Sequence, residues 1–358
     1  MEKGTLVQDI GEFALLERLT AVLGSVGLGA GQGVIRGIGD DAAVLQPTPG
    51  TRLLATSDML IEGIHFDLSY ISPRQLGWKA LAVSLSDIAA MCGNPRWALV
   101  TLGIRPDLEI GFLENIYAGI AELAKKYGII IVGGDTCSSP EGLVLDICIL
   151  GEAHRAEVVY RSGAREGDII LVTGSLGASA AGLLCLQKKI EHIDPGMKDS
   201  LLKAHLTPTP RVKEASILVK SGIVGAVNDI SDGLASELHE IALASGCGAH
   251  IWAERIPIDK PTAYLAQQLK TDPLHWALYG GEDYELVITI SGGKGSPLKA
   301  RRLARSIMKA TGTPLHFIGR IFPASEGLKI VYSGDRVEPL LPRGYNHFCP
   351  HLPTQGLC

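Results

Sequence analysis

The sequence predicts an α/β protein of two domains, and three observations support this. Its 358 residues exceed the usual size of a domain with a single hydrophobic core. Short apolar runs of strand length alternate with segments whose apolar residues recur at helical spacing. Acidic residues beside glycine, serine or threonine recur next to apolar segments in both halves of the chain. The composition, 46% hydrophobic and 20% charged, is ordinary for a globular protein.

The first half of the chain predicts a helix followed by alternating strands and helices. Pro73 suits the first turn of a helix that Ser72 would cap. The glycine-rich segment 24–39 interrupts all regular structure, either as a mobile loop or as one that cradles phosphate, and its glycine content does not decide between them. The expected helices are Asp9–Leu23, Pro73–Ala90 and Leu108–Tyr127, and the expected strands are Ala42–Leu45, Arg52–Thr56, Trp97–Ile104, Ile129–Val132 and Leu143–Glu152.

A boundary is expected where the chain turns polar, between residues 151 and 165. It separates a first domain, residues 1–152, from a second, residues 153–358. In the second, the loop 174–177 opens a helix that ends near Gln187, and segment 292–296 is predicted to be a turn because it lacks the first glycine of a P-loop. The other expected elements are helices Arg211–Lys220, Leu234–Ala244 and Leu298–Thr311 and strands Asp168–Thr173, His250–Trp252, Leu286–Ile290, His316–Ile321 and Leu328–Tyr332.

Charge and cysteine usage exclude several classes of protein. The net charge of −5 and the lack of a basic run argue against nucleic acid and acidic membranes as partners. The apolar runs are too short to span a bilayer, and the N-terminus has no signal pattern. Seven widely spread cysteines without a C-x-x-C pair fit a reducing compartment, so we expect a cytoplasmic protein.

Six aspartates with small neighbours are the strongest functional signal. They are Asp41, Asp58, Asp87, Asp135, Asp229 and Asp232. Any one of them is explained by ordinary turn chemistry. Together they indicate Mg²⁺, a hard cation that takes oxygen ligands and shares them with substrate phosphates. Two carboxylates about 4 Å apart repel by roughly 4 kcal/mol at an effective dielectric constant of about 20, so a converging set would require cations.

Other polar residues can be interpreted either as ordinary structural residues or as functional ones. Arg161 has the planar fork that matches phosphate oxygens but can equally be a surface arginine. His65 follows the Asp58 strand closely enough to face the same cleft, and Glu282 can bind a substrate amine or simply belong to a turn. The tail set His347, Cys349, His351 and Cys358 matches no structural zinc pattern. No G-x-S-x-G hydrolase motif occurs.

The acidic motifs and their neighbours resemble the thiamine-monophosphate kinase family of the aminoimidazole-ribonucleotide-synthetase-like superfamily. The residues that carry the resemblance are Gly37–Ala42, Ser57–Asp58, Gly63–Phe66, Lys79–Met91, Gly133–Thr136, Arg161–Ala164, His205–Arg211, Asp229–Leu234, Gly280–Glu285 and Gly344–Phe348. The last two point to this kinase family, whereas the aspartate motifs are shared across the superfamily. The extra glycines at 27–33 depart from the family pattern.

The resemblance implies a site and an activity. It implies an N-terminal domain that forms a β-barrel across a homodimer, a C-terminal α/β domain, and transfer of phosphate from ATP to thiamine monophosphate. The implied Mg²⁺ ligands are the six aspartates with Thr56 and Ser57. The implied ATP contacts are Gly134, Arg161 and Ser231, the substrate contacts are His65, Glu282 and Tyr345, and the catalytic set is Asp58, Asp135, Arg161 and Asp232.

The chemistry expected of such a site is direct in-line transfer. The acceptor phosphate already carries an anionic oxygen, so no strong general base and no phospho-enzyme are expected. Two alternatives stay open. A hydrogenase-maturation dehydratase would use a terminal cysteine such as Cys358, although the expected Pro-Arg-x-Cys ending is missing. A non-catalytic ATP-binding scaffold would have lost some of the aspartates, and all six are present.

Overall fold

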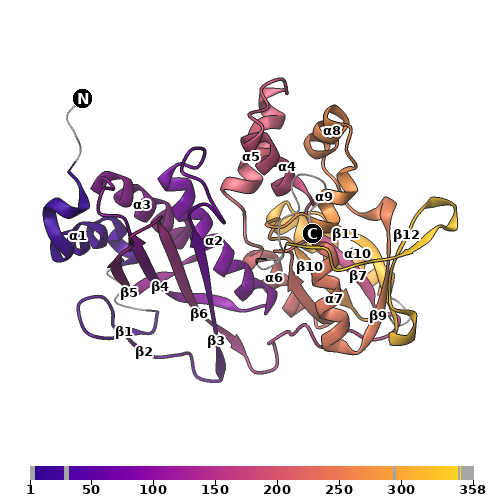
Figure 1. Ribbon diagram of the computed structural model, residues 1–358. Helices are drawn as coiled ribbons and strands as arrows, with labels where there is room; N and C mark the ends of the chain where they lie inside the picture. The colour runs from indigo at the N-terminus through magenta and orange to yellow at the C-terminus, as the bar shows by residue number, and fades with distance from the viewer. Residues whose placement is uncertain (1–4, 28–31, 293–295, 346, 348–358) are drawn as a thin grey trace. The chain divides into compact units, whose positions relative to one another are not determined.

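The computed structural model describes residues 5–27, 32–292, 296–345 and 347, and it divides into two compact units (Figure 1). The first consists of Met1–Ile88 with Gly93–Ala156, and the second of Ala89–Cys92 with Glu157–Cys358. Strands and helices occur in both, so the predicted two-domain α/β fold is confirmed. None of the described helices is long and apolar enough to cross a membrane.

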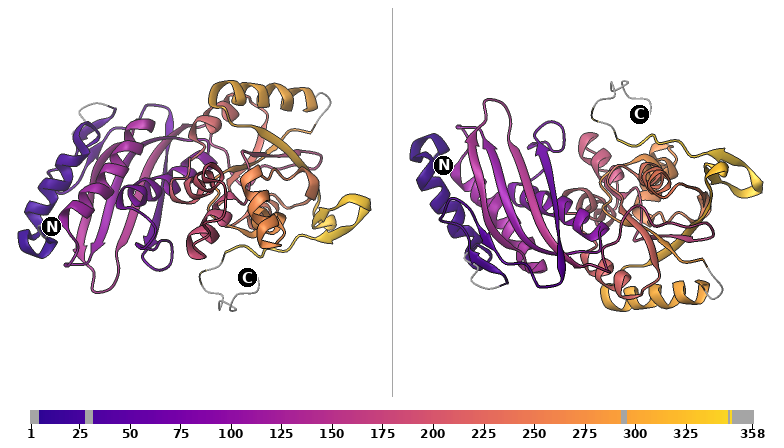
Figure 2. Two further views of the ribbon diagram at one scale, coloured as in Figure 1. Left: turned by 90° about the horizontal axis from the view of Figure 1, so that it is seen from above. Right: turned by 90° about the horizontal axis from the view of Figure 1, so that it is seen from below.

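The first unit is built on a four-stranded sheet in the order β3-β6-β4-β5, whose strands lie side by side in Figure 2. Only the β4–β5 pair is parallel. A smaller sheet joins β1 and β2. The elements are α1 Val7–Leu23, η1 Gly24–Val26, β1 Val34–Arg36, β2 Val44–Leu45, β3 Thr51–Ile61, α2 Pro73–Ala90, β4 Asn94–Ile104, α3 Ile110–Tyr127, β5 Ile130–Ser138 and β6 Val144–His154.

Helix α2 packs on one face of this sheet, and its sequence explains both its start and its position. Ser72 Oγ accepts from the Gln75 N–H (3.3 Å) while Gln75 Oε1 accepts from the Ser72 N–H (3.0 Å), which is the expected cap. A Cβ at Gly77 would lie 1.9 Å from the Ile116 carbonyl oxygen of α3, so only glycine lets these helices approach so closely. The opposite face of β3 is exposed, including Leu53 at 53% and Met59 at 51%.

The second unit is built on a seven-stranded sheet in the order β13-β12-β9-β11-β7-β10-β8. One core cluster packs β7, β8 and β10 against α7, and a smaller one joins α4, α5, α8 and α9. The strands are β7 Ile169–Thr173, β8 Val224–Asp229, β9 Cys247–Trp252, β10 Leu286–Ile290, β11 Leu315–Pro323, β12 Leu328–Val331 and β13 Val337–Pro339. The helices are α4 Ala178–Gln187, α5 Pro195–Leu206, α6 Val212–Lys220, α7 Leu234–Ser245, α8 Lys260–Leu269, α9 Pro273–Tyr279 and α10 Ser296–Thr311, with short turns η2 Ala253–Arg255, η3 Ala324–Glu326 and η4 Ser333–Asp335.

Several local expectations were wrong. The segment 24–39 contains β1, and Gly133–Asp135 lies within β5 rather than at its end. Helices α5, α8 and α9 were not predicted, although each has a proline in its first turn. In each, an aspartate side chain caps the helix: Asp194 accepts from Met197 N–H, Asp259 from Thr262 N–H and Asp272 from Leu274 N–H. The turn predicted at 292–296 lies largely outside the described residues.

Candidate functional site

A pair of carboxylates lies between β3 and α2 in the first unit. The Thr56 hydroxyl donates to Asp87 Oδ2, and Asp58 Oδ2 is buried without a hydrogen-bond partner among the described residues. Burial and the negative charge of Asp87 raise the pKa of Asp58 to about 6, which the nearby Ser84 hydroxyl offsets in part. Ionised together, these carboxylates repel each other, and a bound cation would relieve that repulsion.

Two other predicted ligands lie on the opposite face of the sheet. Because successive strand residues alternate in direction, Ser57 faces away from Thr56 and Asp58. Its hydroxyl donates to Asp146 Oδ1 at 2.6 Å. The strand register pairs Asp146 with Thr101 and Thr101 with Asp135, which places these three residues on one face. Asp146 is a member of this group that the sequence alone did not single out.

The remaining first-unit residues have separate surroundings. Asp41 is exposed, and its N–H donates to Asp40 (3.0 Å). His65 Nδ1 accepts from the Ile61 N–H at 3.0 Å, which fixes the imidazole against the end of β3. Gly134 has φ +157°, and a Cβ there would lie 1.8 Å from the Val100 carbonyl oxygen, so the backbone at this position tolerates no side chain.

The six aspartates are divided between the two units, four in the first and Asp229 and Asp232 in the second. In the part of the chain that the structure describes, no three His, Cys, Asp or Glu side chains gather closely enough to hold a metal ion. Of the tail set, His347 is described and lies 3.5 Å from the Tyr345 hydroxyl, while Cys349, His351 and Cys358 lie outside the described residues.

In the second unit, two motifs that are far apart in the sequence form one hydrogen-bonded structure. The Glu282 N–H donates to the Ser231 carbonyl at 2.7 Å, and the Tyr284 N–H donates to the Ile230 carbonyl at 2.9 Å. In return, the Ile230 N–H donates to the Glu285 carbonyl at 2.7 Å. The segment Asp229–Asp232, with its predicted metal and ATP contacts, therefore lies directly beside the predicted substrate contact Glu282.

Arg161 and Tyr345 join this region. Arg161 Nε donates to Asn228 Oδ1 (2.9 Å) and Nη1 pairs with Glu240 (3.0 Å), while 51% of the side chain stays exposed. The Tyr345 N–H donates to the Asp232 carbonyl at 3.3 Å. Burial, followed by the charges of Glu282 and Asp232, raises the pKa of the Tyr345 hydroxyl. The structure thus brings together the predicted residues of the second unit.

The sequence analysis missed Glu237, which lies beneath this region. The residue is buried in the first turn of α7, where its carboxylate accepts from the Asp232 N–H (3.1 Å), the Ser231 hydroxyl (3.4 Å) and the Asn228 amide. Burial and the neighbouring Asp229 raise the pKa of Glu237 to about 9. The signal in the sequence was an acidic residue on the apolar face of a helix that begins at the aspartate motif.

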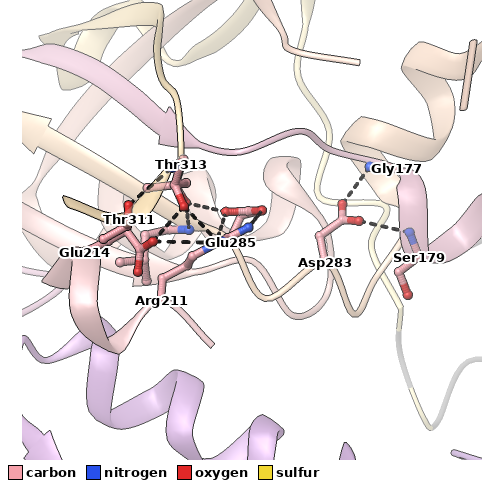
Figure 3. Close-up of polar contacts among 10 residues, drawn as sticks. Gly177, Ser179, Arg211, Glu214, Asp283, Glu285, Thr311 and Thr313 are labelled. Carbon is pink, nitrogen blue, oxygen red and sulfur yellow. Dashed lines mark hydrogen bonds and ion pairs between the residues drawn. The ribbon is translucent and has the colours of Figure 1, made fainter. Parts of the chain in front are cut away.

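Two acidic residues that follow Glu282 in the chain, Asp283 and Glu285, anchor its loop (Figure 3). Asp283 accepts from the N–H groups of Gly177 (2.7 Å) and Ser179 (3.2 Å) at the start of α4. Glu285 accepts from Arg211 Nε at 2.6 Å and from the Thr173 hydroxyl at 2.5 Å. These anchors hold the backbone in a conformation rare for residues with side chains, with φ +67° at Glu282 and +51° at Tyr284.

Comparison with known proteins identifies the family. The models of the AIR synthase related protein N-terminal and C-terminal domains match residues 39–153 and 165–330. A thiamine-monophosphate kinase of Bacillus subtilis (strain 168) is 37% identical over 317 residues, 87% of this chain and 93% of that protein. A structure of AaThiL complexed with AMPPCP and TMP is 32% identical, with a TM-score of 0.72 over 96% of this chain and 99% of that one.

A structure of the Escherichia coli hydrogenase maturation protein HypE has a TM-score of 0.73 but only 19% identity over 92% of this chain and 97% of that one, so it shares the fold alone. The family resemblance drawn from the sequence motifs is confirmed by the matches that cover both halves of the chain. By sequence and by fold, the chain belongs to the thiamine-monophosphate kinase family of AIR synthase related proteins.

Proposed function

We propose that this protein phosphorylates thiamine monophosphate to thiamine diphosphate with ATP as the phosphate donor. The observation that carries this proposal is the hydrogen-bonded pairing of segment Ile230–Ser231 with segment Glu282–Tyr284. These hydrogen bonds join the segment that we propose to contact ATP to the segment that we propose to contact the acceptor. The ligands of the related AaThiL structure, AMPPCP and TMP, are the kind of pair that such a site would hold.

Mg²⁺ is the cation we assign to the carboxylates. Asp58 has a buried oxygen without a hydrogen-bond partner among the described residues and lies beside Asp87, and an oxygen-only donor set of this kind suits Mg²⁺. When bound, Mg²⁺ neutralises phosphate charge and orders the phosphate oxygens. The full proposed ligand set is Asp41, Thr56, Ser57, Asp58, Asp87, Asp135, Asp229 and Asp232.

The protein's own residues would then bind and align two anions. The Arg161 guanidinium, held by Asn228 and Glu240 yet half exposed, is suited to donate hydrogen bonds to phosphate oxygens. Gly134 and Ser231 are the other proposed ATP contacts, while His65, Glu282 and Tyr345 hold the acceptor. Because the acceptor oxygen is already anionic, alignment and charge neutralisation supply the rate enhancement, and no covalent phospho-enzyme forms.

The test is product analysis by chromatography after incubation with ATP, Mg²⁺ and thiamine monophosphate. We expect stoichiometric ADP and thiamine diphosphate, and equal rates from Cys358→Ser, since the terminal thiol has no part in direct transfer. A protein that binds ATP but makes no thiamine diphosphate would be a scaffold. A carbamoyl-derived adduct on Cys358 would instead identify the dehydratase. Either result would refute the proposed function.

We also propose a cytoplasmic homodimer in which the first domain, residues 1–152, forms a barrel with its copy and the second domain, residues 153–358, supports the acceptor. Two exposed apolar side chains of β3, Leu53 and Met59, favour this pairing, because they leave apolar surface on an open sheet. Charged residues there should abolish association.

Met59→Glu is therefore expected to sediment as a monomer where the wild type sediments as a dimer, measured by analytical ultracentrifugation. The matched control is Leu243→Glu on α7, because Leu243 is 87% exposed but lies in the second unit. This control should remain dimeric. A monomeric wild type, or a Met59→Glu variant that stays dimeric, would contradict the proposed interface.

A further inference from the structure

A buried histidine contacts the Glu282 side chain. His205 lies in the last turn of α5 and is 2% exposed. Its Nδ1 is 3.3 Å from Glu282 Oε2, and the Glu282 side chain is 26% exposed. Glu282 therefore reaches from a buried imidazole to the accessible surface. We propose that His205 is a positioning residue that orients the Glu282 carboxylate for the acceptor substrate, an inference that rests on the proposed function.

Ser179 holds the imidazole in turn. Its Oγ lies 3.1 Å from the same His205 Nδ1, and the serine is 1% exposed. Although Ser179, His205 and Glu282 are the residue types of a hydrolytic triad, serine and glutamate here share one ring nitrogen, whereas a triad uses both. The buried serine hydroxyl is also withdrawn from any substrate. The three residues therefore form a support for the carboxylate and not a nucleophilic centre.

The backbone around Glu282 is fixed independently of this support. The Glu282 N–H is bonded to the Ser231 carbonyl, and Asp283 is anchored at the start of α4. These contacts fix the backbone of Glu282 but do not set the torsion angles of its side chain. A glutamate side chain loses rotamer entropy when it is ordered. Contact with His205 orders it before the substrate arrives, which lowers the entropic cost of binding.

The chemistry of the acceptor suits such a carboxylate. Thiamine monophosphate carries an exocyclic amine and a positively charged ring, and an oriented carboxylate can bind either group by a charge-assisted hydrogen bond or by ion pairing. The phosphates, in contrast, are anionic and would be repelled by Glu282. Loss of the histidine should consequently weaken binding of thiamine monophosphate and leave the binding of ATP unchanged.

Two substitutions of His205 distinguish the loss of its polar contact with Glu282 from a change in side-chain volume. His205→Leu fills the site without an N–H group, whereas His205→Asn can place its amide nitrogen near the position of Nδ1. We expect His205→Leu to raise the KM for thiamine monophosphate about tenfold, because the polar contact that orients the Glu282 carboxylate is lost, with the KM for ATP unchanged. His205→Asn should recover most of this loss. His250→Leu, which changes a histidine of the sheet that stacks on Phe322, is the control and should change neither KM.

A double-mutant cycle with Glu282→Gln decides whether His205 acts through Glu282. If it does, adding His205→Leu to Glu282→Gln raises the KM for thiamine monophosphate no further. Additive effects, an equal rise in the KM for ATP, or an unchanged KM in His205→Leu would each overturn the proposal. Thermal unfolding verifies that the variants fold. A wild type without kinase activity would refute the proposed function, whereas an active wild type that does not need His205 refutes only this inference.

Discussion

Asp58→Asn is expected to lose at least about 100-fold in turnover, because charge neutralisation at phosphate is the main contribution to such a transfer. The substitution keeps the shape of the side chain but removes the charge that, with Asp87, would hold the cation. Steady-state rates at saturating ATP and thiamine monophosphate, over a range of Mg²⁺ concentrations, measure the effect. Asp107→Asn, which changes an exposed carboxylate paired with Arg105, should keep full activity.

The same variant should be more stable than the wild type when no metal is present. The pKa of Asp58 is raised from 3.8 to about 6 in the folded protein, so ionisation there opposes folding. The stability of the wild type relative to Asp58→Asn therefore falls as the pH rises from about 4 to about 6 and then stays constant. The expected difference above this range is about 3 kcal/mol.

Chemical denaturation in EDTA at several pH values measures this difference. Added Mg²⁺ should stabilise the wild type but have little effect on the variant, because only the wild type retains both carboxylates. A variant that is less stable than the wild type at pH 7 without metal would contradict the assignment of Asp58 as a carboxylate held for a cation.

Arg211→Met is expected to lower the free energy of unfolding by about 3–5 kcal/mol, the usual effect of removing one partner of a buried ion pair. The Arg211 side chain is 17% exposed and binds the buried Glu285 with two nitrogens. It also donates to Thr313 (3.1 Å), whose hydroxyl donates to the buried Glu214 at 2.6 Å (Figure 3). Methionine fills the space but leaves two buried acidic residues without their cation.

Urea denaturation at pH 7 tests this prediction. The double variant Arg211→Met, Glu285→Gln should recover part of the lost stability, since one buried charge is removed with its partner. Arg74→Met is the matched control, because Arg74 pairs with Glu122 on the surface, where both side chains are about half exposed. Its expected cost is below about 1 kcal/mol. If Arg211→Met lowers the free energy of unfolding by as little as this, the contacts of Arg211 with Glu285 and Thr313 have no structural role.

Local sequence patterns were sufficient to predict most of the helices and strands and the family to which the chain belongs. Ser72, Pro73 and Gln75 fix the start of α2, and the apolar run of β10 gives its bounds as predicted. Such signals act within a few residues, so they can be recognised along the chain. The same holds for the motifs that carry the family resemblance, since each lies within one short segment. The missed helices α5, α8 and α9 also have a local signal, an aspartate cap followed by a proline.

Tertiary structure decided which of these residues meet. The pairing of Ile230 with Tyr284 and Glu285 depends on hydrogen bonds between segments more than 50 residues apart, for which no local pattern exists. Likewise, only packing places His205 against Glu282, which lies 77 residues further along the chain. An acidic or histidine side chain can occur in almost any helix or strand. Whether that side chain is buried, and which charges lie near it, is decided only when distant elements pack together. The sequence therefore determined which chemical groups are available, and the fold determined which of them act on one another.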